Sequence, residues 1–419
     1  MTGSHHRDVL LREVLRGELH AAQELRRELH AQPRVSGKEG PTLKRVLEAL
    51  PDGQVEYVAG TGAMLRVGGS GPAVGVRGEL DALPIVERTG VAWAATNGAM
   101  HACGHDVHLA AVVALARAVD RVGAILRGRR GTRDGGLESV ADGTGRVAPL
   151  MVVLQPREES FPSGARDIVK AGALERHRVH AMIGAHVQPV LEPGVIACTP
   201  GPVNASADEF RVTIRGRDGH AAYPHLARDP VAAMAQVIVA AQQLVSRVTD
   251  PMVPTVVTFG TVHAGTAPNA IPGEAVARGT LRTLSRSWRE TLHARFTEQV
   301  RNVAAAHGCE ADVQVFPGEP VLVNDAALAV RAGELLREQG RTVSEELRSC
   351  GGDDFAQYGA VVPSLMMFVG VDTEAGLHSP DFLPDDSSVE AVAESLLAGY
   401  LAADSTDAAD AADRVSARL

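Results

Sequence analysis

Potential metal ligands are concentrated in one short stretch of this sequence. Residues 100–108 read Met-His-Ala-Cys-Gly-His-Asp-Val-His, which places five ligand-type side chains within eight positions: His101, Cys103, His105, Asp106 and His108. A packed core has little use for such a run, because each imidazole or carboxylate buried there needs a polar partner. A divalent cation supplies that partner, so the run predicts a metal site.

Cys103 and His105 form the most specific pair in this run. A Cys-x-His spacing at a strand-to-helix junction would put both side chains at the mouth of a parallel sheet. Ligands bind at that place in open α/β sheets. The structural alternative is a buried cysteine beside a histidine that caps the helix, since a free cysteine is often a core residue.

Two adjacent glutamates, Glu158 and Glu159, follow an apolar strand expected at 149–154. Adjacent carboxylates in an extended loop point in different directions, so one can bind a metal while the other acts as a general base. Metal-assisted hydrolysis needs this division of roles. A solvated acidic loop is the alternative, because a pair of glutamates is common.

Two further histidines follow the same pattern of placement. His186 ends a strand expected at 179–186, and His378 lies in a Leu-His-Ser-Pro turn near the C-terminus. A single histidine in either place is more often structural than ligating. The prediction of a metal site therefore depends on the conjunction of four ligand-type sites, each at a strand end or in a turn.

Strands and helices alternate through the first half of the chain. We expect strands at 54–67 (a pair), 73–77, 149–154 and 179–186, and helices at 8–30 and 109–122. This alternation predicts an α/β domain with a mostly parallel central sheet. The Gly/Arg/Asp-rich segment 123–147 is expected to be a mobile surface insertion, and the Ala/Asp-rich tail at 402–419 is expected to fray.

The middle of the chain changes character and predicts an inserted α+β domain. Its expected order is strand 209–216, helix 229–248, strands 253–262 and 275–281, helix 287–307 and strand 311–316. This β-α-β-β-α-β order is the ferredoxin-like arrangement. We therefore expect a first domain formed by 1–203 and 321–419, interrupted by a second domain at 204–320.

Composition excludes several other classes of protein. The chain has 419 residues, a net charge of −10 and only 3% aromatic residues, which together oppose nucleic-acid binding. No signal-like N-terminus and no run of 18 apolar residues is present, so we expect no membrane span. The four cysteines are scattered, which indicates reduced thiols and a cytoplasmic protein rather than a disulfide framework.

Five motifs occur in an order that resembles a known family. They are Asp81-Ala82-Leu83-Pro84, the 100–106 run, Gln-Pro-x-Glu-Glu at 155–159, His186-Val187 and Leu377-His378-Ser379-Pro380. As an ordered set, over roughly residues 20–400, they resemble the aminoacylase/carboxypeptidase-type metallopeptidase family. The most similar branch is that of the amidohydrolases, which includes hippurate hydrolase and the plant auxin-conjugate hydrolases.

The resemblance implies a dinuclear centre with two divalent metal ions per subunit, Zn²⁺ or else Mn²⁺, Co²⁺ or Ni²⁺. The implied ligands are Cys103, His105, Glu159, His186 and His378. Cys103 would take the bridging position that other branches fill with Asp. Glu158 would be the general base and proton shuttle. Asp81 would orient one of the metal ligands without binding the metal itself.

For the inserted domain, the resemblance implies a lid that also forms a homodimer. His220, in Gly-His-Ala-Ala, would stabilise the oxyanion, although a surface histidine in a turn is the alternative. Asn269 and Arg282 would bind the substrate carboxylate, for which an amide and a guanidinium are suitable donors. The implied substrate is a small N-acyl amino acid or a related amide.

Two positions depart from the family pattern. Glu79 stands where the family usually has Asp, and Asp353 stands where it usually has Glu. Neither change removes an implied ligand, so activity is expected to survive, while substrate preference is open.

Three rival functions remain at this level. The same machinery suits a dipeptidase or carboxypeptidase, which only pocket shape would separate from an amidohydrolase. A catalytically silent binding protein is disfavoured, because every implied ligand and Glu158 are present. A redox role for Cys103 is also disfavoured, because the sequence contains no Cys-x-x-Cys pair.

Overall fold

The computed structural model describes residues 3–131 and 146–405 and divides the chain into two compact units. The first unit is drawn from Met1–Gly201, Val323–Leu347 and Gln357–Leu419. The second, inserted unit is drawn from Pro202–Leu322 and Arg348–Ala356. The predicted mobile insertion and the predicted frayed tail lie largely outside the described residues, at 132–145 and 406–419.

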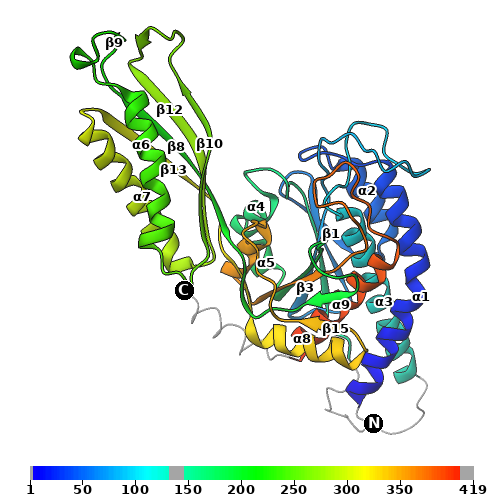
Figure 1. Cartoon of the computed structure of the whole chain (residues 1–419). Helices are drawn as coiled ribbons and strands as arrows, with labels where there is room; N and C mark the ends of the chain where they lie inside the picture. The colour runs from blue at the N-terminus through cyan, green and yellow to red at the C-terminus, as the bar shows by residue number, and fades with distance from the viewer. Residues whose placement is uncertain (1–2, 132–145, 406–419) are drawn as a thin grey trace. The chain divides into compact units, whose positions relative to one another are not determined.

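The first unit is built on an eight-stranded sheet (Figure 1). In spatial order its strands are β1 (Gln54–Val58), β2 (Gly62–Val67), β4 (Leu150–Gln155), β3 (Ala73–Glu79), β5 (Val179–Val187), β16 (Ser364–Val369), β6 (Val195–Ala197) and β15 (Thr342–Ser344). The four strands β4, β3, β5 and β16 are mutually parallel. Every residue of β3, β4 and β16 is buried, as expected for parallel strands covered on both faces.

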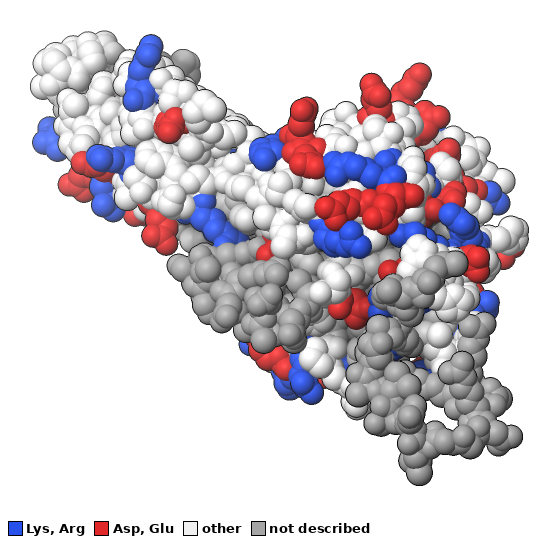
Figure 2. All heavy atoms as spheres, turned by 90° about the horizontal axis from the view of Figure 1, so that it is seen from below, with Lys and Arg blue, Asp and Glu red and all other residues white. Residues whose placement is uncertain are grey.

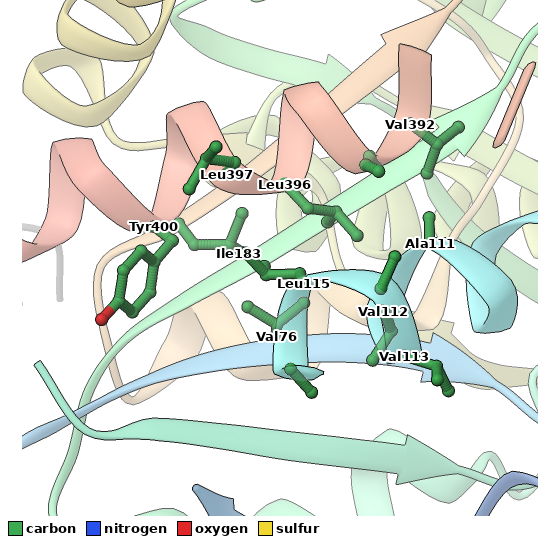
Figure 3. Packing of buried hydrophobic residues seen from close by; sticks show 14 of the residues in the cluster. Val76, Ala111, Val112, Val113, Leu115, Ile183, Val392, Leu396, Leu397 and Tyr400 are labelled. Atoms are coloured by element: carbon green, nitrogen blue, oxygen red, sulfur yellow. The ribbon is translucent and has the colours of Figure 1, made fainter. Parts of the chain in front are cut away.

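Helices cover this sheet. They are α1 (Gly3–Ala31), α2 (Gly40–Ala49), α3 (His105–Gly131), α4 (Gly164–Lys170), α5 (Ala173–Arg176), α8 (Ala326–Glu338) and α9 (Ser387–Asp404), with a 3₁₀ segment η3 (Asp354–Ala360). Leu115 of α3 and Leu396 of α9 pack with Val76 of β3 and Ile183 of β5 (Figure 3). A Cβ at Gly399 would lie 2.5 Å from Ile183 Cγ2, so only glycine allows α9 to approach the sheet this closely.

Helix α3 begins inside the ligand run, four residues earlier than the sequence pattern predicted. Gly104, which precedes it, has a φ of +80°, and a Cβ there would lie 2.4 Å from Val187 Cγ2. Glycine is therefore required both by the turn and by the close approach to the end of β5. This turn places Cys103 and His105 beside the carboxyl end of that strand.

The second unit has the predicted ferredoxin-like order. Its strands β8 (Ser206–Arg215), β10 (Thr255–Ala264), β12 (Glu274–Thr283) and β13 (Glu310–Glu319) form an antiparallel sheet in the order β10-β12-β8-β13. Helices α6 (Pro230–Gln243) and α7 (Arg286–Ala306) cover one face of it (Figure 1). The unit also contains a short pair, β9 (Gly219–His220) and β11 (Ala270–Ile271), and a 3₁₀ turn η1 (Pro224–Leu226). Strands β7 (Gly201–Asn204) and β14 (Leu322–Asn324) span the points where the chain passes between units.

Helix α6 continues into a π-helical turn, η2 (Leu244–Val248). Within the described part of the chain, Pro230–Val248 is the one helical stretch long and apolar enough to cross a membrane by length and composition. Its buried side chains, which include Met234 and Val237, belong to the core between the sheet and α7.

On the face drawn in Figure 2, basic and acidic groups lie interspersed among the described residues rather than separated into large patches. Neighbouring charges of opposite sign therefore partly offset one another on this face.

A cluster of buried charges joins α1 to the first turn of α3. His30 lies with Nδ1 3.0 Å from Asp106 Oδ2 and Nε2 3.0 Å from Glu87 Oε1, and Arg26 Nε is 3.3 Å from the same Asp106 oxygen. Burial alone would lower the pKa of His30, but the bonds to Asp106 and Glu87 outweigh it and raise that pKa. His30 is therefore held as an imidazolium between two carboxylates.

This cluster predicts a pH-dependent contribution to stability. A raised pKa means that the His30 contribution is fully present below its ordinary value of 6.5 and is lost as the pH rises through the folded-state value. We expect His30→Gln to lower the free energy of unfolding at pH 6 by about 1.5–3 kcal/mol, as for a bond to a charged group. Urea unfolding at pH 6 and pH 9 should show a smaller difference between mutant and wild type at pH 9, and an equal or larger difference would contradict the assignment.

Candidate metal centre

The carboxyl ends of three neighbouring parallel strands bring together side chains that are distant in sequence. Asp81 follows β3, Glu158 and Glu159 follow β4, and His186 is the penultimate residue of β5. Because these ends meet at one edge of the sheet, the residues converge where α/β folds bind their ligands.

His105 and His186 are both oriented by backbone carbonyls. His105 Nδ1 lies 2.8 Å from the carbonyl oxygen of Asp81, and His186 Nδ1 lies 2.6 Å from that of Val187. A carbonyl only accepts hydrogen bonds, so each Nδ1 carries the proton. Each Nε2 is therefore the nitrogen that remains for a metal, which is the orientation that a metal-ligating imidazole needs.

Cys103 lies between His186 and Glu159. Its Sγ is 3.4 Å from His186 Nε2, and ligand atoms of Cys103, Glu159 and His378 all lie within 4.8 Å of one another. Burial raises the pKa of the Cys103 thiol well above its usual value, and the charges of Glu159 and Glu158 raise it further. Without a cation, this cysteine is a neutral thiol.

A second ligand set overlaps the first. Ligand atoms of His105, Glu158 and Glu159 also lie within 4.8 Å of one another, so Glu159 belongs to both sets. Burial would raise the pKa of Glu159, but the ion-pair contact with His378 and the charge of His105 hold it below its usual value. His378 Nε2 lies 3.2 Å from Glu159 Oε1, and the His378 side chain is 52% exposed.

These residues fit a pair of divalent ions. Within the described residues, His105 Nε2 is buried and has no hydrogen-bond partner; Glu158 Oε2 lies 3.7 Å away. An unsatisfied buried nitrogen is costly, and a cation would satisfy it. The donor set of one thiolate sulfur, imidazole nitrogens and carboxylate oxygens suits Zn²⁺ and also Mn²⁺, Co²⁺ or Ni²⁺.

Asp81 holds the loop that carries the two glutamates. Its Oδ1 accepts the amide of Glu158 at 3.1 Å, and its Oδ2 accepts the amide of Glu159 at 3.0 Å and the Ser36 hydroxyl at 2.6 Å. Because the Asp81 carbonyl also fixes His105, this one residue orients three others of the cluster.

Glu79 and His108 form a pair behind the cluster. Glu79 is ion-paired with Arg77, and its Oε2 is 3.2 Å from His108 Nδ1. His108 Nε2 accepts the amide of Val187 at 3.0 Å, so both nitrogens of this histidine are already used. Glu79, one of the two positions that depart from the family pattern, thus contacts His108, and His108 in turn holds the end of β5.

The remaining members of the ligand run point elsewhere. Asp106 faces Arg26 and His30, as described above. His101 is buried with neither ring nitrogen hydrogen-bonded within the described residues, and burial lowers the pKa of His101 to about 3, so it is neutral. Of the five ligand-type residues in the run, Cys103 and His105 belong to the two ligand sets described above.

The candidate residues of the second unit lie at two places within it. His220 pairs with Ala270 between β9 and β11, and the amide of Ala221 donates to the Asn269 carbonyl at 3.1 Å. His220 is exposed, and its Nδ1 accepts the amide of Ala222 at 3.1 Å. Asn269 thus lies beside His220.

Arg282 lies apart from this pair. It is the penultimate residue of β12, whereas Asn269 precedes the start of that strand, so they lie at opposite ends of it. Arg282 donates to the carbonyl of Cys350 at 3.1 Å. The departure at Asp353 is in the same unit, where its Oδ1 accepts the amide of Phe355 at 2.8 Å.

One buried carboxylate near the cluster was missed by the sequence interpretation. Glu39 accepts the amide of Arg157, the residue directly before Glu158, at 3.0 Å. It lies 119 positions before Glu158 and belongs to none of the motifs, so no local signal marks it.

Comparison with known proteins gives two matching family models. The peptidase family M20/M25/M40 matches residues 75–131, and the peptidase dimerisation domain matches residues 204–308. An N-acetylcysteine deacetylase of Bacillus subtilis is 32% identical over 87% of this chain and 92% of its own length. An N-acetyldiaminopimelate deacetylase of Exiguobacterium sibiricum is 34% identical over 88% of this chain and 95% of its own length.

Solved structures show the same likeness. A putative aminohydrolase from methicillin-resistant Staphylococcus aureus has a TM-score of 0.83 at 27% identity, covering 94% of this chain and 99% of its own. A Bacillus subtilis protein described as a dinuclear metal-binding peptidase of the M20 family has a TM-score of 0.75 at 28% identity, covering 92% and 98%. The resemblance inferred from the motifs is confirmed: the chain belongs to peptidase family M20/M25/M40 and is a hydrolase of amide bonds.

Proposed function

We propose that this protein is a metal-dependent amidohydrolase that cleaves the amide bond of N-acyl amino acids. The observation that carries the proposal is the pair of imidazoles, His105 and His186, whose Nδ1 protons are committed to carbonyls and whose Nε2 atoms face a thiol and carboxylates. The substrate class is supported by relatives that are named as deacetylases of N-acetylcysteine and N-acetyldiaminopimelate.

The proposed ligands of two divalent ions are Cys103, His105, Glu159, His186 and His378. When bound, such ions polarise the amide carbonyl and lower the pKa of water. Cys103 would be one of these ligands, since it lies near both His186 and Glu159, and the family resemblance assigns it the bridging position.

Glu158 is the proposed general base. Its side chain is 13% exposed, and its Oε2 lies 3.7 Å from His105 Nε2, so the carboxylate borders the proposed metal site and remains accessible to a reacting water. Glu158 would take a proton from the attacking water and deliver it to the leaving amine. Asp81 would keep this carboxylate in place through the amide of Glu158.

The second unit carries the remaining proposed residues. We propose that His220 stabilises the oxyanion of the tetrahedral intermediate and that Asn269 and Arg282 bind the carboxylate of the amino acid. Because these two residues lie at opposite ends of β12, they would act on one substrate only if they came from different subunits of the homodimer. The match to a peptidase dimerisation domain supports a homodimer formed through this unit. We further propose a cytoplasmic location, as the reduced cysteines indicate.

Replacement of the proposed base should separate catalysis from metal binding. Glu158→Gln keeps the shape of the side chain but removes its basicity, so we expect turnover of N-acyl amino acids to fall at least about 10²-fold while the metal content is retained. Steady-state kinetics and elemental analysis of the same preparation test this expectation.

Glu159→Gln is the matched control for Glu158→Gln, because it makes the same carboxylate-to-amide replacement at the neighbouring residue. It should weaken metal binding as well as turnover, since Glu159 belongs to both ligand sets. Full activity of Glu158→Gln would remove Glu158 from the role of base.

Metal should protect Cys103 from alkylation. A thiolate that is bound to a cation is shielded from electrophiles, and Cys103 is 7% exposed without one. We expect iodoacetamide labelling of Cys103, followed by peptide mass spectrometry, to slow at least about tenfold when Zn²⁺ or Mn²⁺ is added to metal-free protein. The partly exposed Cys350 is the internal control, and equal rates at Cys103 with and without metal would rule out ligation.

A substrate panel separates the proposed function from its nearest rival. N-acetyl and N-benzoyl amino acids should be cleaved with higher kcat/KM than dipeptides after reconstitution with Zn²⁺, Mn²⁺, Co²⁺ or Ni²⁺. Faster cleavage of the dipeptides across the panel would instead identify a dipeptidase or carboxypeptidase. No hydrolysis of any compound by the metal-loaded protein would contradict both.

A further inference from the structure

Three consecutive backbone amides at the candidate site donate to buried carboxylates. The amides of Glu158 and Glu159 donate to Asp81, and the amide of Arg157 donates to Glu39 Oε1 at 3.0 Å. The main chain that carries the proposed base and a proposed ligand is thus held at successive residues by two carboxylates from different parts of the first unit.

The position of Glu39 is itself fixed by neutral donors. It is fully buried, its Oε1 also accepts the amide of Gly37 at 2.8 Å, and its Oε2 accepts the hydroxyl of Thr61 at 2.6 Å. Among the described residues Glu39 makes no ion pair. A buried carboxylate is tolerated only when donors surround it, so its hydrogen bonds to these three donors decide where it lies.

Arg157 needs to be held because its backbone is strained. Its φ is +53°, a left-handed conformation that side chains other than glycine rarely adopt. Its side chain is also tied down, with Nη2 3.2 Å from the Ala59 carbonyl oxygen and 2.5 Å from Asp167 Oδ2. The backbone just before Arg157 is also tightly packed: a Cβ at Gly164 would lie 1.8 Å from the carbonyl oxygen of Pro156, so only glycine fits there.

We propose that Glu39 is a positioning residue for the Glu158–Glu159 pair. By accepting the amide of Arg157 it keeps that residue left-handed, and this backbone turn sets the directions in which the two following carboxylates leave the chain. Without Glu39, Arg157 can relax toward an ordinary backbone conformation and rotate Glu158 away from its working position. The inference rests on the proposed function only for the role of Glu158; the hold on the loop stands on the contacts alone.

The kinetic test compares three variants. Glu39→Ala removes every contact and should lower kcat about 10–100-fold at saturating metal, with KM nearly unchanged, as for other residues that orient a metal site from behind. Glu39→Gln should retain kcat to within about threefold, because its amide oxygen can still accept from Arg157 and its NH₂ can donate to the Thr61 hydroxyl. Thr61→Val removes one contact of Glu39 without touching Arg157 and should also stay near wild type.

Three kinetic outcomes would overturn the inference. They are an unchanged kcat in Glu39→Ala, a defect in Glu39→Gln as large as that in Glu39→Ala, and an equally large defect in Thr61→Val. If Glu39→Ala does not fold, Glu39→Leu takes its place with the same expected loss of kcat, because leucine is similar in size but cannot accept the amide of Arg157.

A second measurement needs no substrate. Amide hydrogen exchange resolved at 157–159 in the metal-free protein should be slow in wild type and in Thr61→Val, and at least about tenfold faster at Arg157 in Glu39→Ala. Unchanged exchange would overturn the inference. If the wild type hydrolyses no N-acyl amino acid, the proposed function fails, while the exchange result still supports or overturns the role of Glu39.

Discussion

The candidate site depends above all on Asp81, a buried residue at the end of β3 that makes hydrogen bonds with both its main chain and its side chain. Its carbonyl fixes the proton of His105, and its carboxylate holds the amides of Glu158 and Glu159. A change at this residue would disturb an imidazole, a proposed base and a proposed ligand together. Residues coupled in this way are expected to show strongly non-additive mutational effects.

The balance of charge around the cluster explains why a cation fits it. Glu79 is neutralised by Arg77, and Asp106 is neutralised by Arg26 and His30, so these carboxylates are satisfied without a metal. His105 Nε2 lies 3.7 Å from Glu158, and His378 Nε2 lies 3.2 Å from Glu159. These two carboxylates thus lie at the place where, among the described residues, a buried nitrogen of His105 has no hydrogen bond.

The sequence could predict those features that are encoded locally. The alternation of strands and helices predicted the α/β sheet, and the order of elements predicted the ferredoxin-like unit. The run at 100–108 predicted a metal-binding cluster because it concentrates ligand-type side chains. Glu39 and the Glu79–His108 pair could not be predicted, since their partners lie in other segments and only the tertiary fold brings them together. The early start of α3 was missed because periodicity does not reveal the glycine turn before it.

The interruption of the first unit by the second has a consequence for the order of folding during synthesis. Strand β16 lies between β5 and β6 in the sheet, yet it is made only after the entire inserted unit. Until residues 364–369 emerge, β5 has an unpaired edge, and such edges invite association with other chains. His378 emerges later still, so a nascent chain contains four of the five proposed ligands well before the ligand set is complete.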